Sequence, residues 1–144
     1  MRCLLTVACL LLFSPAGLAQ PRQPELRVMM CEIIDESGTG WVPDFLMLTR
    51  QTEGPQAGRI EVFDPILKDL VRRPIKAVVT ADDRQSRSYG WALGKVRNHS
   101  GQYAERLDFR LRVSKADGSA TLLVTAEGYA NRMTGAGQCV SPSE

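Results

Sequence analysis

Two of the four cysteines and the single histidine have the most versatile chemistry of the side chains in this sequence; the other two, Cys3 and Cys9, lie in an N-terminal stretch that we expect to be removed. Cys31 ends an apolar run, Cys139 lies in the terminal stretch "GAGQCV", and His99 is the single histidine. A structural zinc site needs four nitrogen or sulfur ligands, and a redox-active pair is typically spaced C-x-x-C. Neither pattern fits these residues, so a disulfide between Cys31 and Cys139 is their expected role.

His99 lies among polar neighbours in "RNHSG". A histidine that acts as an acid or base needs a partner that orients its ring, and only distant residues such as Asp83 and Ser86 could supply one. We therefore expect His99 to be a solvated turn residue, and the pair Asp82 and Asp83 to form a turn instead of a catalytic dyad. We predict no catalytic residue and no enzymatic activity. The less favoured alternative is a hydrolase that uses scattered serine, aspartate and His99.

The stretch "DESGTGW" (35–41) combines acidic residues with glycines. It lacks the alternating acidic ligands and the closing glutamate of a calcium-binding EF-hand. It also lacks the glycine spacing of a dinucleotide-binding turn. We expect a plain turn here, and we predict neither a metal nor a cofactor.

Arginines alternate with apolar residues along "RLDFRLRV" (106–113). Successive side chains of a strand point to opposite faces, so the arginines should share one face. With Arg87 or Arg97 they could bind an anionic ligand such as a glycan or a lipopolysaccharide phosphate. The alternative is a solvated face on which Asp108 interrupts the positive charge. The candidate ligand surface consists of Arg106, Arg110 and Arg112.

Five aromatic residues could line an apolar cavity of the kind in which small barrels hold one ligand. They are Trp41, Tyr89, Trp91, Phe109 and Tyr129. The alternative, which the short chain favours, is that these side chains simply fill the core.

The first 19 residues, "MRCLLTVACLLLFSPAGLA", resemble a Sec-type secretory signal. Arg2 precedes an apolar run, and Gly17 and Ala19 occupy the −3 and −1 positions of a cleavage site before Gln20. The run is shorter than the ~20 residues that a membrane-spanning helix needs. We predict cleavage near Ala19/Gln20, no transmembrane segment, and a periplasmic or secreted location.

The charges of the chain are nearly balanced, with 18 basic and 16 acidic side chains in 144 residues. Nucleic-acid binding would demand a basic excess, so we predict no nucleic-acid partner. In an exported protein, the two cysteines outside the signal most simply pair with each other. Their bond would close a loop of about 108 residues, which chain-entropy theory associates with up to ~4.7 kcal/mol of stability. Gly135 and Gly137 would permit the close approach.

Hydrophobic alternation and turn residues predict the secondary structure. Asp117 and Gly118 lie between two alternating runs, which is a strong hairpin signal. A short helix should follow Asp64, which can cap it, with Pro65 in its first turn and Pro74 at its end. Strands are expected over 26–34, 41–51, 59–63, 75–81, 88–96, 106–113 and 120–126, and the tail 127–140 should return Cys139 to the strand of Cys31.

Short links between six or seven strands favour antiparallel pairing of neighbours. We predict a mainly all-β fold, an antiparallel meander curled into a small barrel or half-barrel, with the helix over one opening. The disulfide would join the N- and C-terminal strands. One face of 88–96 consists of small residues, which would let the sheet bend or another backbone approach. The expected organisation is a cleaved signal (1–19), a flexible lead-in (20–25) and a single β-rich domain (26–141).

The order of these features resembles a family of small exported proteobacterial proteins of uncharacterised function. The resemblance rests on the signal, the early cysteine, "GWVP", "PIKAVV", "GQYAERLDFRLRVSKADGSATL" and "GYANRMTGAGQC", and it covers most of the chain after the signal. It implies a location in the bacterial envelope. It brings no known catalytic residue to a position of this sequence.

A disulfide-closed β scaffold without a catalytic constellation favours a non-enzymatic ligand- or protein-binding module of the envelope. The alternative is a structural or inhibitory accessory protein that acts by surface contact, for example on an envelope enzyme. The sequence specifies neither the ligand or protein partner nor the oligomeric state.

Overall fold

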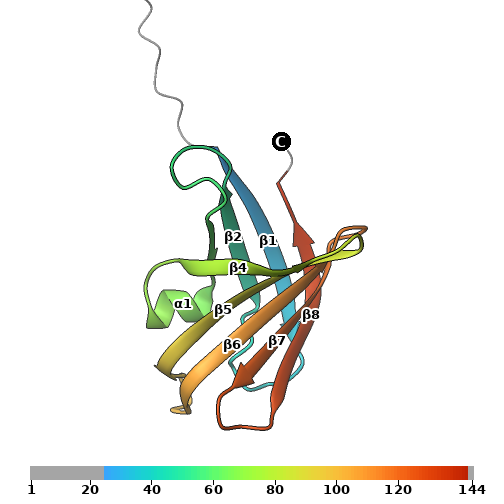
Figure 1. Ribbon diagram of the computed structural model, residues 1–144. Coiled ribbons are helices and arrows are strands. Elements are labelled where there is room, and N and C mark those ends of the chain that lie inside the picture. Colours follow the sequence, from blue (N-terminus) through green and yellow to red (C-terminus); the bar gives the residue numbers. More distant parts are fainter. Residues whose placement is uncertain (1–24, 143–144) are drawn as a thin grey trace, which may run out of the picture.

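Eight antiparallel strands form a closed barrel, in which neighbours in sequence are neighbours in space and β1 pairs with β8 (Figure 1). The structure, a computed structural model, describes residues 25–142. The predicted signal and residues 20–24 of the predicted lead-in lie outside the described residues. The predicted antiparallel meander is confirmed. The strands are β1 (Leu26–Asp35), β2 (Phe45–Gln51), β3 (Ile60–Phe63), β4 (Ile75–Asp82), β5 (Ser86–Arg97), β6 (Tyr103–Ser114), β7 (Ser119–Ala126) and β8 (Arg132–Val140).

Two details of the strand prediction need correction. The described residues contain eight strands, because the tail 127–140 includes β8. Gly135 and Gly137 occupy inward positions of β8, so this strand lacks the apolar alternation that marks the others. The strand predicted over 41–51 begins only at Phe45; Pro43, which has no amide hydrogen for a ladder, lies before it.

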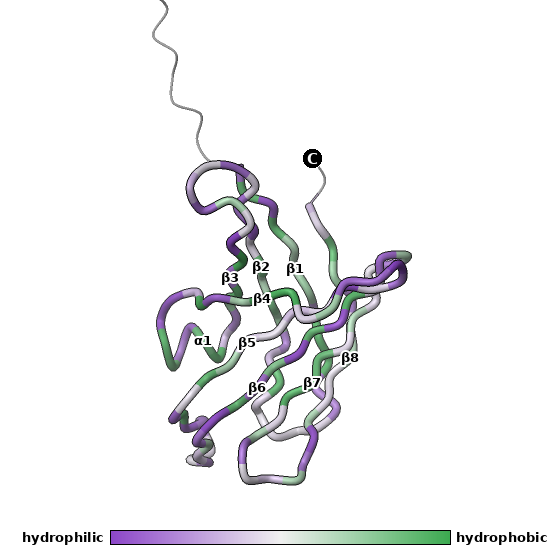
Figure 2. Tube along the Cα trace, in the orientation of Figure 1, coloured by the Kyte–Doolittle hydropathy of each residue, from purple (hydrophilic) through white to green (hydrophobic). Residues whose placement is uncertain are grey.

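The core follows the period-two alternation of the strands. The predicted inward set of β6, Leu107, Phe109, Leu111 and Val113, is buried, and the arginines between them are exposed. Figure 2 shows this alternation of hydrophilic and hydrophobic residues along β6. Trp91 of β5 lies directly across from Phe109, and the two rings stack at 5.4 Å between centroids. These aromatic side chains therefore fill the core of the barrel.

The short helix α1 (Pro65–Leu70) connects β3 to β4 at one end of the barrel. The Asp64 side chain caps it by accepting a hydrogen bond from the Leu67 amide at 2.7 Å, as predicted. Leu67 is fully buried in the core, so the helix covers part of this end. The helix ends before Pro74, because the amides of Val71 and Arg72 both donate to the Leu67 carbonyl and Arg72 turns left-handed at φ 60°.

The barrel closes where β1 meets β8, and the disulfide lies in this seam. Cys31 and Cys139 are directly paired across it, with 3.9 Å between their Cα atoms, and both are buried. A Cβ at Gly137 would collide with the Glu32 carbonyl, and one at Gly135 would lie 2.6 Å from Ile33 Cγ2. The predicted bond between first and last strands, and the role of the glycines beside it, are confirmed.

β4 pairs with β3 over only three residues, Ile75 to Ala77. Beyond Ala77 it continues to Asp82 paired with β5, with a bulge at Thr80. Figure 1 shows β4 crossing the front of the barrel, in front of β1 and β2. The sheet therefore splays at the β3–β4 seam.

Candidate functional site

The outer face of β4 to β8 carries a groove of about 680 Å³, here called the arginine groove. The small-residue face of β5 contributes Gly90 and Ala92. The other residues along it are Lys76, Val78 and Thr80 of β4, Trp91 of β5, Arg106, Asp108, Phe109 and Arg110 of β6, Leu123 and Thr125 of β7, and Arg132 of β8.

The register between β5 and β6 explains why this face is hollow. Arg110 lies directly across from Gly90, Asp108 from Ala92, and Arg106 from Gly94. Long charged side chains on β6 thus stand beside positions with little or no side chain on β5. Gly90 and Ala92, two residues of the small-residue face predicted for 88–96, therefore form the floor of the groove.

The charge of the arginine groove is strongly positive. Four basic side chains line it, Lys76, Arg106, Arg110 and Arg132, against the single carboxylate of Asp108. At neutral pH the lining therefore carries three net positive charges. Between them lie the exposed Val78 and the partly buried Leu123, so the groove combines cations with apolar surface.

The three candidate arginines share the outer face but differ in their partners. Arg106 is held by Asp108, with Nη2 2.8 Å from Oδ1, and this contact raises the pKa of Arg106. Arg112 donates from Nε to Ser86 Oγ at 3.0 Å and does not line the groove. The side chain of Arg110 makes no hydrogen bond or ion pair with any residue from 25 to 142. Of the three candidate arginines, Arg110 is therefore the one best placed to bind a ligand.

The two additional arginines named from the sequence lie elsewhere. Arg87 pairs with Asp82 at 2.8 Å near the β4–β5 turn. Arg97 lies over the Tyr103 ring, 5.7 Å from its centroid, at the opposite end of β5. Lys76 and Arg132 instead complete the groove. They are isolated in sequence, and only the curvature of the sheet brings them to the arginines of β6, so no local pattern could have identified them.

The five candidate aromatics do not surround a common cavity. Trp91 and Phe109 are stacked in the core, and Tyr89 is half-buried on β5. Trp41 and Tyr129 line a separate pocket of about 240 Å³ at the end of the barrel that bears α1. Tyr103 also lines this pocket; it belongs to β6 but precedes the strand predicted over 106–113, so the alternation did not identify it. The other lining residues are Thr39, Gln102, Ala104, Ala126, Asn131 and Met133.

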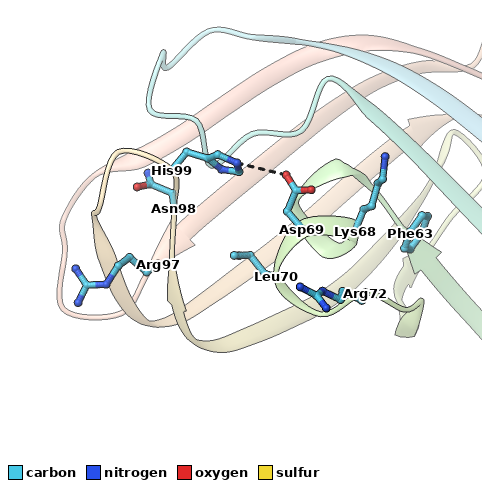
Figure 3. A pocket seen from close by; sticks show the side chains of 8 residues that line it. All are labelled: Phe63, Lys68, Asp69, Leu70, Arg72, Arg97, Asn98 and His99. Carbon is cyan, nitrogen blue, oxygen red and sulfur yellow. Dashed lines mark ion pairs between the residues drawn. The ribbon is translucent and has the colours of Figure 1, made fainter.

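His99 lies at a third pocket, between α1 and the β5–β6 loop (Figure 3). Its Nε2 is 3.6 Å from Asp69 Oδ2, and the two side chains are 85% and 50% exposed. The distant partners considered from the sequence, Ser86 and Asp83, lie at the other end of β5 and contact each other. Within residues 25–142, the lining of this pocket includes no hydroxyl or thiol side chain. The two side chains form an exposed contact without an adjacent hydroxyl or thiol.

The acidic stretches form turns, as the sequence predicts. Asp35 accepts hydrogen bonds from the Ser37 and Gly38 amides. Arg87, with help from Lys115, lowers the pKa of Asp82 to about 2, and the Ser86 amide lowers that of Asp83. Both neighbouring aspartates are therefore ionised at neutral pH and hold no proton for acid catalysis.

No protein-family model, curated protein or solved structure matches this chain. In the part that the structure describes, no helix has the length and apolar character required for a membrane span. The Cys31–Cys139 disulfide is compatible with an oxidising compartment outside the cytoplasm.

Proposed function

We propose that this protein is an exported, non-enzymatic binding module of the bacterial envelope that holds an anionic ligand in the arginine groove. The observation that carries the proposal is the concave surface with three net positive charges, in which Arg110 has no partner among the described residues. The predicted signal peptide and the disulfide support an extracytoplasmic location.

The chemistry of the groove favours a ligand with both charge and apolar surface. A guanidinium presents several N–H donors in a planar fork that matches carboxylate and phosphate groups. Charge-assisted hydrogen bonds of this kind are roughly twice as strong as neutral ones. The aliphatic side chains of Val78 and Leu123 lie in the same groove and would contact the apolar part of such a ligand.

A thermal-shift screen with anionic envelope components tests the proposal. The probes are lipopolysaccharide, anionic phospholipid, an acidic glycan and acidic peptides. We expect at least one probe to raise the Tm of the wild type, with an effect that declines as salt rises. Arg110→Glu should weaken binding of that probe at least tenfold, because it removes a donor and reverses a charge.

Arg50→Glu provides the matched control. Arg50 is an exposed arginine of β2 that does not line the groove, so the variant makes the same change in net charge and should bind like the wild type. Absence of a shift with all four probes would overturn the proposal, as would equal losses in the two variants.

A further inference from the structure

β4 has a free edge beyond the β3–β4 seam. From Val78 to Asp82 it pairs with β5 on one side, and no residue between 25 and 142 pairs with its other side. Alternate residues of an antiparallel strand direct their N–H and C=O groups to the same side. This segment therefore presents unpaired backbone donors and acceptors, which can accept an additional strand.

Apolar side chains at this edge are exposed on both faces of the strand. Val78 is 47% and Val79 43% exposed. Val78 lines the arginine groove on the outer face, and Val79 lies across from Tyr89 on the opposite face. Unpaired edges are usually protected by charged side chains, whereas here two valines stand in succession. An added strand would cover both.

The free edge and the arginine groove form a continuous surface. Val78, Gly90 and Arg110 are successive members of one row of directly paired residues across β4, β5 and β6. Gly90 has no side chain, so none separates Val78 from Arg110 along this row on the outer face. Lys76 lies on the same face of β4, and its cross-strand neighbour Glu61 is engaged by Arg59 at 2.6 Å. Outward side chains of an added strand would thus face basic residues.

The charge and the twist of this surface favour some added strands over others. A second copy of the chain, paired through its own β4, would bring two basic grooves together, which like-charge repulsion disfavours. The bulge at Thr80 increases the local twist and works against long, flat strand stacking. A short segment with acidic residues on one face and apolar residues on the other fits both the groove and Val79.

We infer that the arginine groove recognises an extended acidic peptide segment of a partner protein, which adds as a strand to the free edge of β4 between Val78 and Asp82. The inference rests on the proposed function, because it names the ligand class of the same groove. Main-chain hydrogen bonds from strand addition would provide affinity, and the basic residues of the groove would provide specificity for acidic side chains.

The test uses an end-capped octapeptide of alternating glutamate and valine. Amide hydrogen exchange of the wild-type protein is followed by NMR with and without this peptide. We expect binding to slow exchange at least tenfold at one or more amides from Val78 to Ala81. Two peptides, each N-methylated at one of the two alternating sets of amides, separate main-chain pairing from charge. Methylation of the amides that face β4 should abolish binding, and methylation of those that face solvent should have little effect. A lysine–valine octapeptide should not bind.

Each contrary outcome has a distinct meaning. Binding without slower exchange at Val78 to Ala81, or equal binding of both N-methylated peptides, would refute strand addition and retain the anion site. Binding of lipopolysaccharide or phospholipid but not of the glutamate–valine peptide would refute the peptide class and retain the proposed function. If exchange at these amides slows with rising protein concentration in the absence of peptide, the edge pairs with a second copy of the chain instead. Failure of all anionic probes would refute the proposed function itself.

Discussion

Arg110 is the direct cross-strand neighbour of Gly90, so the arginine of β6 without a partner among the described residues stands beside a position that has no side chain. Two strands therefore form the groove: β6 contributes the charge of Arg110, and β5 leaves room beside it at Gly90. This relationship makes the size of residue 90 as important for binding as the charge of residue 110.

Gly90→Leu should therefore abolish binding without any change in charge. The new side chain would occupy the groove floor, and its Cβ would lie 2.8 Å from Thr80 Cγ2, so we expect a stability loss of about 1–3 kcal/mol as well. Binding of the anionic probes should fall at least tenfold, measured by titration calorimetry below the Tm. Gly94→Leu is the control, because Gly94 lies on the same face of β5 outside the groove. Equal affinity of Gly90→Leu and the wild type would contradict the location of the site.

Removal of the disulfide should reduce stability before it affects binding. The bond closes a loop of 108 residues, for which the chain-entropy relation gives about 4.7 kcal/mol as an upper figure. Urea unfolding of Cys31→Ala/Cys139→Ala should show a loss of several kcal/mol. Thiol titration of the denatured protein produced from Gln20 onward, which lacks Cys3 and Cys9, should detect two thiols only after reduction. The double variant, where folded, should still bind the anionic probe, since neither cysteine lines the groove.

Asp64 should make stability depend on pH in an unusual direction. Burial raises its pKa from 3.8 to about 6, although the Leu67 and Ile66 amides oppose this, and Oδ2 has no hydrogen-bond partner within the described residues. The folded state therefore binds this proton more tightly than the unfolded state. Its contribution to stability is complete below about pH 4 and is lost as the pH rises through about 6.

Asp64→Asn should remove this dependence. The amide oxygen can still accept from the Leu67 N–H, so the helix cap is retained. We expect the variant to gain on the order of 1–3 kcal/mol relative to the wild type between pH 4 and pH 7, measured as the difference between their unfolding free energies at each pH. If the difference in unfolding free energy between variant and wild type stayed constant from pH 4 to pH 7, Asp64 would not be the group that causes the pH dependence.

Arg72→Gly should stabilise the protein. Arg72 adopts φ 60° directly after α1, a left-handed conformation that costs a residue with a Cβ roughly 1–2 kcal/mol. Glycine removes this cost but loses more chain entropy on folding, so we expect a net gain of about 0.5–1 kcal/mol in thermal unfolding. Arg73→Gly, at the adjacent position without positive φ, should instead be neutral or destabilising. A loss of stability in Arg72→Gly would contradict this account.

The sequence predicts the barrel well where alternation is strong. The pattern from Leu107 to Val113 identifies β6 and its buried face, and Asp117 with Gly118 correctly predicts the hairpin to β7, in which Gly118 has a φ of 73°. The last strand is harder to predict, because glycines replace the apolar residues that would mark its inward face. At Gly135 the space of a side chain is taken by Ile33 and Val42, and at Gly137 by the backbone of Glu32, all remote in sequence.

The candidate site is predicted only in part. The alternation of β6 places three arginines on one face, but it does not show that Arg106 is bound to Asp108 and that Arg112 lies outside the groove. These differences arise from side-chain pairing and from cross-strand register. Neither the splaying of β4 nor the approach of Lys76 and Arg132 has a local signal, because both depend on how the whole sheet curves.

The bond between the first and last strands makes most of the barrel a covalent ring. Every connection between strands, from the β1–β2 loop to the β7–β8 loop, lies between Cys31 and Cys139. A protease that cuts any one of these connections therefore produces two fragments that stay joined through sulfur. Such a nicked molecule retains all eight strands as a single unit, and non-reducing electrophoresis would not distinguish its mass from that of the intact protein.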